Sequence, residues 1–591
     1  MFQTSTHDRN RRSPQPMVTT FGHGPLRTTV ECVVALLLAV LLFRTFAAEG
    51  FMISTGSMAP TLLGFHKRVA CPKCGELFAY GTAWDESANH LAASSSEFEV
   101  EQSICPNCSQ QGIDLSHVPR NHGDQLLVNK QAYLWNSPQR WEIAVFRNPN
   151  LPTEAYVKRI VGLPGEAVSI RHGDLWINGE IARKPLAVQR TIWIPVYHQE
   201  HRATHDNSFQ DRWVSTDGWL EPTSNLRGWR SSPTTFLFRE LTAGVATEAL
   251  PAVSSDSEQN TTSQPAGQTA VAAESSISWI EYQHWVRSGG THITTVTLEE
   301  WPSDLQLATL PPSGLKYDSK TKKLSCFGVL PDDVVSFLRT NSQNLVFLQA
   351  IDKLKAASHL APITDHYGYN PAANSMEPNS VRDIAFVGEL SLPQEQGHFF
   401  IQLTDGLERY TLDFDSQRES VRLFLEGTDR PLRVGPWSPP ERGQSVRIEA
   451  SKIDRQMALA IDGHEVFPAW PIAAVPPGAE SPRSPVRFGA LSGTVRISNP
   501  TLYRDVFYTF QRSRHAVNRP YPLGPEEFFV LGDNSPVSHD SRQWEKPGVH
   551  RKLLVGKPFL VHLPSQPGRL KIGDHEWLLR LPDFDRVRFL R

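Results

Sequence analysis

Two side chains that could act together as a nucleophile and a general base stand far apart in the chain. Ser57 lies between a glycine, which permits unusual backbone angles, and Pro60, which fixes one, so its hydroxyl is held in a rigid loop. Lys158 lies in an apolar stretch and is followed by Arg159. Because burial and a neighbouring cation both lower the pKa of a lysine, Lys158 is suited to act as a neutral base. Taken alone, the loop around Ser57 is also compatible with an ordinary turn.

Two further segments complete a pattern. Residues 123–129 read Gly-Asp-Gln-Leu-Leu-Val-Asn, a turn that leads into a strand, and residues 532–542 read Gly-Asp-Asn-Ser-Pro-Val-Ser-His-Asp-Ser-Arg. With Ser-Met-Ala-Pro-Thr at 57–61 and Tyr-Val-Lys-Arg-Ile-Val-Gly-Leu-Pro-Gly at 156–165, the chain resembles the type I signal peptidase family. Members of that family are membrane-anchored serine–lysine endopeptidases that remove signal peptides. The similarity covers roughly residues 30–70, 120–185 and 520–565.

The resemblance implies a role for each matched residue. Ser57 would be the nucleophile and Lys158 the general base, with Ser538 orienting the lysine amine. The supporting and oxyanion residues would be Thr55, Arg159, Ser538, Asp540 and Arg542, with threonine at 55 where many members carry serine. An extended substrate would add as a strand beside residues 51–53 and 155–157. The apolar residues placed to line its pockets are Ile53, Met58, Leu62, Tyr156 and Val157. No cofactor is required for this chemistry.

An apolar stretch at residues 30–48 is expected to anchor the catalytic part. Nineteen residues at 1.5 Å each give roughly 28 Å, close to the thickness of a bilayer core. Four arginines and one aspartate precede it, so residues 1–29 are expected in the cytoplasm and the remainder outside. A cleaved secretory signal is the alternative. The predicted location is a bacterial plasma membrane, crossed once.

Four cysteines form two Cys-Pro-x-Cys knuckles with thirty residues between them. They are Cys71, Cys74, Cys105 and Cys108. This arrangement is typical of tetrahedral zinc coordination, although the separation exceeds the usual 15–20 residues. Two disulfides are the alternative outside the cytoplasm. Four cysteine ligands leave no open coordination position, so a zinc ion here would be structural.

The length of 591 residues exceeds what one peptidase domain needs, and the net charge of −3 excludes a globally basic nucleic-acid binder. Residues 245–277 are rich in serine, alanine and threonine and are expected to be flexible. Between about 381 and 508, alternating strands recur every ~10 residues, which predicts a β-sandwich. That region loosely resembles laminin-G and concanavalin-like jelly rolls, which often bind sugars; a glycan or protein ligand is therefore conceivable.

The predicted fold is mainly β, with an N-terminal transmembrane helix and a peptidase domain split twice. Its expected parts are a cytoplasmic segment 1–29, an anchor 30–48, catalytic segments 49–70, 120–184 and 516–591, a zinc-ribbon-like insert 71–119 and a jelly-roll insert 185–515. The predicted function is cleavage of signal peptides from exported preproteins after small residues, through an acyl-enzyme. A non-enzymatic, glycan-binding surface protein on a degenerate peptidase scaffold is the alternative.

Overall fold

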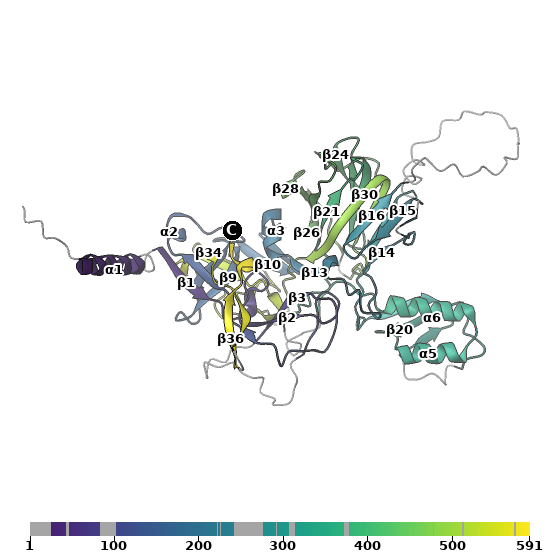
Figure 1. Ribbon diagram of the computed structural model, residues 1–591, viewed down its shortest axis with the longest axis horizontal. Helices are drawn as coiled ribbons and strands as arrows, with labels where there is room; N and C mark the ends of the chain where they lie inside the picture. The colour runs from purple at the N-terminus through teal and green to yellow at the C-terminus, as the bar shows by residue number, and fades with distance from the viewer. Residues whose placement is uncertain are drawn as a thin grey trace, which may run out of the picture.

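The computed structural model of this chain is mainly β (Figure 1). It describes residues 25–42, 47–82, 102–221, 223–224, 226–240, 276–290, 292–306, 314–370, 378–476, 478–510, 513–572 and 575–590. The segment 245–277, expected to be flexible, lies outside the described residues as far as position 275. Most of the stretch between the two cysteine knuckles, at 83–101, also lies outside them.

One sheet gathers strands from both ends of the chain. Its order is β1 (Ala48–Met52), β7 (Gln125–Asn129), β34 (Leu554–Val561), β8 (Ile143–Arg147), β9 (Ala155–Gly162), β32 (Glu527–Leu531) and β33 (Val549–His550), and β37 (Arg588–Phe589) pairs with β34. The strand β32 pairs with β9 although the large insertion separates them in sequence. The three segments predicted to be catalytic, 49–70, 120–184 and 516–591, therefore contribute strands to a single sheet. The short helix α2 (Ala132–Trp135) follows β7.

A second, smaller sheet stands where the large insertion leaves and rejoins this domain. Its order is β12 (Glu180–Ile181), β11 (Asp174–Ile177), β10 (Ala167–Arg171) and β31 (Tyr521–Pro522). Strands β10 and β11 form a hairpin, and Gly173 in its turn has a positive φ of 90°, which glycine adopts without strain. The helix α3 (Leu186–Ile192) follows, and its Ile192 packs into the core of this sheet.

The cysteine knuckles lie between short strands beside the peptidase sheet. The first follows β2 (His66–Ala70) and precedes β3 (Leu77–Gly81), and β6 (Arg120–Asn121) pairs with the other edge of β2. The second lies between β4 (Gln102–Ser103) and β5 (Ile113–Asp114). The two loops thus have the same design, a tight turn closed by a pair of antiparallel strands.

The large insertion is built around one long strand, β30 (Val486–Arg504). Its first half pairs with β17 (Ser278–Tyr282) and β22 (Gly397–Thr404), and its second half with β13 (Ile194–His198), β16 (Thr235–Arg239) and β21 (Ile384–Ser391). Further strands extend both halves: β14 (Trp213–Ser215), β15 (Gly228–Ser231), β23 (Arg409–Asp415), β24 (Ser420–Leu425), β25 (Arg433–Pro436), β26 (Val446–Ile453), β27 (Gln456–Ile461), β28 (His464–Glu465) and β29 (Trp470–Pro471). Apart from β25 and β28, each of these strands contributes side chains to one apolar core.

The strands of this insertion begin earlier than the sequence indicated. The prediction started near residue 381, but strands between 194 and 282 join the same sheets, and Trp213 and Trp229 are fully buried in the shared core. These early strands are short and separated by loops, so period-2 alternation is too brief to be recognised. Their tryptophans pack the interior instead of offering a surface platform.

A small unit that the sequence did not predict lies within the insertion. It contains β18 (Ile293–Thr297), β19 (Lys316–Asp318), β20 (Lys323–Phe327), α5 (Asp332–Asn341) and α6 (Leu345–Ser358), and it has its own apolar core. Figure 1 shows it standing apart from the sandwich strands.

Near the other end of the chain, β35 (Ser565–Ile572) and β36 (His575–Pro582) form a separate hairpin.

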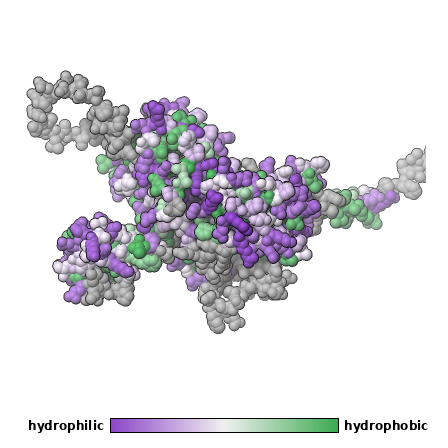
Figure 2. Space-filling model, turned by 180° about the vertical axis from the view of Figure 1, so that it is seen from behind, coloured by the Kyte–Doolittle hydropathy of each residue, from purple (hydrophilic) through white to green (hydrophobic). Residues whose placement is uncertain are grey.

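The helix α1 (Pro25–Leu42) projects from the peptidase sheet (Figure 1). Its apolar residues, among them Leu36, Leu37 and Leu41, are exposed, and they form the green stretch at one end of the molecule in Figure 2. Among the described residues, no helix reaches the length and apolarity needed to cross a membrane. Residues 43–46 of the expected span 30–48 lie outside the described part, so the anchor stays a prediction.

Candidate active site

Ser57 and Lys158 meet in the peptidase domain. Ser57 lies in the single turn η2 (Gly56–Met58), and Lys158 lies on β9. The Nζ atom of Lys158 donates a 2.6 Å hydrogen bond to Ser57 Oγ, and both side chains are buried. The two residues that the sequence singled out, one hundred positions apart, are therefore within direct proton-transfer distance.

The environment of Lys158 favours its neutral form. Burial is the largest influence and lowers the pKa of the ammonium from 10.5 to about 8. Asp540 and Asp533 raise it and Arg542 lowers it, but none of these forms an ion pair with Lys158. The cost of burying the charged ammonium therefore exceeds the attraction of the nearby carboxylates. A substantial fraction of Lys158 is neutral near pH 8.

Ser538, Asp540 and Arg542 form a buried network behind the lysine. Arg542 Nη2 lies 2.8 Å from Asp540 Oδ2, and its Nε donates to Asp540 Oδ1 at 2.9 Å. Ser538 Oγ donates to Asp540 Oδ2 at 2.7 Å. Burial alone raises the pKa of Asp540, but the charge and hydrogen bonds of Arg542 lower it below its usual value. The hydroxyl of Ser538 is thus directed at the carboxylate, and the structure gives no hydrogen bond from it to Lys158.

Arg159 is paired with Asp533. It donates to both carboxylate oxygens of Asp533, at 2.8 and 2.7 Å, and to the carbonyl of Trp141 at 2.7 Å. Thr61, in the loop after the nucleophile, donates to the same carboxylate at 2.6 Å. Asp533 therefore ties the lysine strand to the nucleophile loop. Its partners come from two other segments, so the local sequence around Asp533 does not reveal this role.

Asn534 and Gly532 hold the backbone around Ser57. The amide of Asn534 donates to the Gly56 carbonyl through Nδ2, and its backbone N–H donates to the Ser57 carbonyl, both at 3.0 Å. A side chain at Gly532 would place its Cβ 2.4 Å from the Ser57 carbonyl oxygen and 2.2 Å from Ser538 Oγ. Close approach to the nucleophile therefore requires glycine at this position.

Thr55 stands at the entrance to the nucleophile. It is exposed, and its Oγ1 lies 3.3 Å from Ser57 Oγ. A hydroxyl at this distance can reach an oxygen that develops negative charge on a carbonyl attacked by Ser57. The structure thus brings Thr55 to the site where the sequence expected it.

A cleft of about 620 Å³ passes over the dyad. Four of the five predicted substrate-binding residues line it: Ile53, Met58, Tyr156 and Val157. Leu62, the fifth, has no exposed surface and packs in the core with Leu126 and Val128, so the structure does not bring it to the cleft. The cleft also contains Tyr369 and Asn370, which belong to the large insertion. No sequence signal pointed to these two residues.

One wall of the cleft is a sheet edge. Strand β8 pairs with β9 from Ala155 to Arg159, whereas β32 pairs with β9 only from Arg159 to Gly162. Residues 155–158 therefore lie beside the cleft just where the ladder with β32 stops. An extended peptide can align along such an edge through backbone hydrogen bonds.

The four cysteines lie together in one buried group. The Sγ atoms of Cys71 and Cys108 are 3.5 Å apart, those of Cys74 and Cys105 are 3.6 Å apart, and all four lie within 4.8 Å of one another. Those distances exceed the ~2.05 Å of a disulfide and match the edges of a tetrahedron with metal–sulfur bonds of ~2.3 Å. The group could therefore hold a metal ion.

The second knuckle also contacts the insertion. Asn107 accepts a hydrogen bond from the backbone N–H of His198 at 2.7 Å and donates to the carbonyls of His198 and His201 at 3.3 and 2.7 Å. Glu76, just after the first knuckle, lies 3.2 Å from His198 Nδ1. The cysteine group therefore lies at the contact between the peptidase domain and the sandwich.

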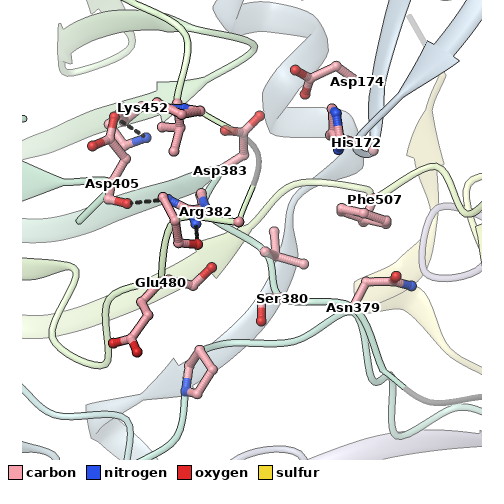
Figure 3. Close-up of a pocket in the computed structure, with 18 of the residues that line it drawn as sticks. His172, Asp174, Asn379, Ser380, Arg382, Asp383, Asp405, Lys452, Glu480 and Phe507 are labelled. Atoms are coloured by element: carbon pink, nitrogen blue, oxygen red, sulfur yellow. Dashed lines mark hydrogen bonds and ion pairs between the residues drawn. The ribbon is translucent and has the colours of Figure 1, made fainter. Parts of the chain in front are cut away.

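A second cleft, of about 780 Å³, lies at another junction between the same two parts (Figure 3). The β10–β11 turn contributes His172 and Asp174, and the sandwich contributes Arg382 and Asp383. Arg455 of the sandwich lies 3.5 Å from Asp174. Charges of both signs thus face each other across the junction, and they are separate from the Ser57 cleft.

Comparison with known proteins points to one family. Residues 116–214 match the family model described as signal peptidase, peptidase S26. Signal peptidase I of Pseudomonas fluorescens is 30% identical over 155 residues, 26% of this chain and 38% of that protein. Signal peptidase I of Leptolyngbya laminosa is 43% identical over 65 residues, 10% and 32% of the two chains, and signal peptidase I V of Bacillus subtilis is 33% identical over 87 residues, 15% and 50%.

These matches confirm the resemblance to the type I signal peptidase family. The chain spans only a third to a half of the length of these relatives. The matched region 116–214 includes Lys158 but neither Ser57 nor the loop at 532–542.

Solved structures similar to part of the chain include two sugar-related proteins. Caenorhabditis elegans galectin LEC-6 has a TM-score of 0.17 and 9% identity, covering 21% of this chain and 83% of the galectin. The Bacillus subtilis carbohydrate binding module CBM66 has a TM-score of 0.15 and 11% identity, covering 21% and 73%. At these scores the likeness says nothing about a ligand of this chain.

Proposed function

We propose that this protein is a serine–lysine endopeptidase of the signal peptidase I type, which cleaves signal peptides from exported preproteins after small residues. The observation that carries the proposal is the 2.6 Å contact between Ser57 Oγ and the buried amine of Lys158. The resemblance to signal peptidases supports the same activity. The alternative, a non-enzymatic surface protein, is not favoured. The relatives that match this chain are peptidases, and the reactive groups of Ser57 and Lys158 are in contact.

The mechanism follows from the positions of the groups. Neutral Lys158 accepts the hydroxyl proton of Ser57 while the oxygen attacks the scissile carbonyl. The backbone N–H of Ser57 and the hydroxyl of Thr55 stabilise the oxyanion. The protonated lysine then gives its proton to the leaving amine, and an acyl-enzyme remains on Ser57. Water, deprotonated by the same lysine, hydrolyses that ester and releases the product.

Substrate alignment is proposed to use the edge of β9. A preprotein segment in extended conformation would hydrogen-bond beside residues 155–158 while Ile53, Met58 and Val157 contact its side chains. The resemblance to signal peptidases is the ground for proposing small residues next to the scissile bond. Residues 30–48 would hold this site against the outer face of a bacterial plasma membrane, with residues 1–29 in the cytoplasm.

The four cysteines are proposed to bind a structural zinc ion, and catalysis needs no cofactor. Four thiolates would complete the tetrahedral coordination and leave no position for a substrate. A zinc ion there would hold the two knuckles together. It would also hold Asn107, which lies in the second knuckle, in its contact with the sandwich. A glycan or protein ligand of the sandwich stays a prediction, to be checked by a glycan-array screen of the full chain.

The test is cleavage of a model preprotein by the purified full chain in detergent. Replacing Ser57 with alanine, or Lys158 with methionine, should abolish cleavage. The matched controls are Ser336→Ala, which removes an exposed hydroxyl on α5, and Lys130→Ala, a surface lysine paired with Glu49 at 3.2 Å. Both controls should cleave at the wild-type rate. Retained cleavage by Ser57→Ala would refute the proposal.

A further inference from the structure

A short segment of the large insertion reaches into the catalytic cleft. Tyr369 and Asn370 line that cleft together with Ser57 and Lys158. The backbone also joins the two parts, because the N–H of Gly81, at the end of the first cysteine hairpin, donates to the Tyr369 carbonyl at 2.7 Å. Insert residues are thus within the site itself and not only beside it.

The base of this segment is fixed to the sandwich. Asp365 accepts hydrogen bonds from the backbone and side-chain nitrogens of Asn379, each at 2.8 Å. Arg504, at the end of β30, donates to the Asp365 carbonyl at 3.0 Å. A movement of the sandwich relative to the peptidase sheet would therefore move Tyr369 and Asn370 as well.

Tyr369 occupies the space between two glycines. A Cβ atom on Gly56 would lie 2.2 Å from Cε1 of Tyr369, and one on Gly81 would lie 2.3 Å from the same atom. The ring is 3% exposed and stacks on Tyr367 at 5.9 Å between centroids, and its hydroxyl donates to the Phe65 carbonyl at 3.3 Å. The ring therefore closes the cleft directly beside the residue that precedes the nucleophile.

Asn370 is joined to the nucleophile loop through a pair of amides. Its Nδ2 donates to Asn534 Oδ1 at 2.9 Å, and Asn534 Nδ2 donates back to Asn370 Oδ1 at 2.7 Å. The same Nδ2 of Asn534 also donates to the Gly56 carbonyl, and the Asn534 backbone donates to Ser57. Asn370 thus fixes the orientation of the amide that holds the backbone of the nucleophile.

We propose that these two residues make the insertion a working part of the peptidase site. Asn370 is a positioning residue for the nucleophile loop. Tyr369 is a specificity-determining residue that limits the size of the substrate side chain lying beside Gly56. The inference rests on the proposed function, and it adds that the activity and its preference for small residues depend on a domain inserted far from Ser57 in the sequence.

The role of Asn370 is tested by two assays on the full chain. In Asn370→Ala, we expect kcat for a preprotein to fall roughly tenfold with KM changed less than about twofold, because the loss of two hydrogen bonds acts on the nucleophile and not on the substrate. Acylation of Ser57 by a small activated ester should slow by a similar factor. Asn370→Asp keeps one acceptor and should give an intermediate rate. The control is Asn341→Ala, on the exposed face of α5.

The role of Tyr369 is tested with paired substrates that carry alanine or leucine at the cleavage position. In Tyr369→Ala, the ratio of kcat/KM for the leucine substrate to that for the alanine substrate should rise at least about tenfold. Tyr369→Phe keeps the ring and should keep the wild-type ratio. If Tyr369→Ala fails to fold, as judged by its melting curve, Tyr369→Leu is expected to shift the ratio in the same direction.

The outcomes separate this inference from the proposed function. If Ser57→Ala loses cleavage while Asn370→Ala and the Tyr369 variants keep wild-type rates and ratios, the inference is overturned and the proposed function stands. If Ser57→Ala still cleaves, the proposed function fails. The ester assay then still decides the positioning role, because unchanged acylation of Ser57 in Asn370→Ala would overturn it.

Discussion

Two lysines of this protein are equally buried but have opposite electrostatic surroundings. Lys158 and Lys184 are 4% and 2% exposed. Burial is the largest influence on both and lowers the pKa of each. In Lys158 it prevails and brings the pKa to about 8. In Lys184 the carboxylates of Asp454 and Asp505, at 2.6 and 2.8 Å, overcome it and raise the pKa well above 10.5.

The difference shows that burial alone does not determine what a lysine does. Lys184 has two carboxylates in direct contact, so it stays charged and holds the sandwich to the peptidase domain. Lys158 contacts a hydroxyl, and Asp540, the carboxylate that most raises its pKa, is already bound to Arg542. Because Asp540 is paired with Arg542, it does not form an ion pair with Lys158, and Lys158 can therefore act as a neutral base.

The largest expected effect is on catalysis. Lys158→Met should lower preprotein cleavage by about 10⁴-fold, because the general base is lost. Lys184→Met should leave the turnover of the folded protein within about threefold of wild type, because this lysine lies outside the cleft. Cleavage rates normalised to folded protein measure both. A greater loss of turnover in Lys184→Met than in Lys158→Met would contradict the assignment.

The same two variants should change stability in opposite directions. Lys184→Met leaves two buried carboxylates without their partner and should lower the unfolding free energy by about 3–5 kcal/mol. Lys158→Met removes a costly buried charge. Since its pKa falls from 10.5 to about 8 on folding, the gain near pH 7 is at most about 3 kcal/mol. Thermal melting of both variants beside Ser57→Ala measures the difference, and a lower melting temperature for Lys158→Met would contradict this comparison.

The pH dependence distinguishes the two lysines without mutation. The cleavage rate should rise with pH up to about 8 and fall about tenfold per pH unit below it, because only neutral Lys158 accepts the proton. Folding raises the pKa of Lys184 above its usual 10.5, so the charged lysine stabilises the folded protein. This contribution to the free energy of unfolding is complete below pH 10.5 and is lost as the pH rises through the higher pKa of the folded state. A rate profile without an inflection between pH 7 and 9 would remove Lys158 as the base.

The smallest effect concerns the cysteine group, which contacts neither lysine. Metal analysis should find about one zinc ion per chain. Replacement of Cys74 with serine should lower the melting temperature and reduce cleavage by a few-fold, because Asn107 loses its fixed position against the sandwich. The apparent pKa of the rate profile should stay near 8. A shift of that pKa in the Cys74→Ser variant would mean that the metal site acts on the dyad.

The catalytic centre was accessible from sequence because its groups lie in short, self-contained motifs. Ser57, Lys158 and the 532–542 loop each have a recognisable local pattern, and the strands predicted between about 381 and 508 include β22 and β23. Their identification needs only neighbouring residues and alternation of period 2.

Other features depend on contacts between distant segments and could not be found in this way. The pairing of Arg159 with Asp533, and of Asn370 with Asn534, joins residues more than 150 positions apart. Neither Tyr369 nor Asn370 stands in a motif. For α5 and α6, however, a local signal existed. Apolar residues recur at helical spacing, as at Val334 and Leu338, after two aspartates in the first turn.

The central claim, that Ser57 is the nucleophile activated by Lys158, is tested most directly by locating the acyl group during turnover. The full chain is mixed with a peptide substrate, quenched in acid within the first turnover, digested and examined by mass spectrometry. The account predicts an acyl adduct on the fragment that contains Ser57, and none in Lys158→Met. An adduct on another residue, such as Ser538, or unchanged acylation in Lys158→Met, would contradict it.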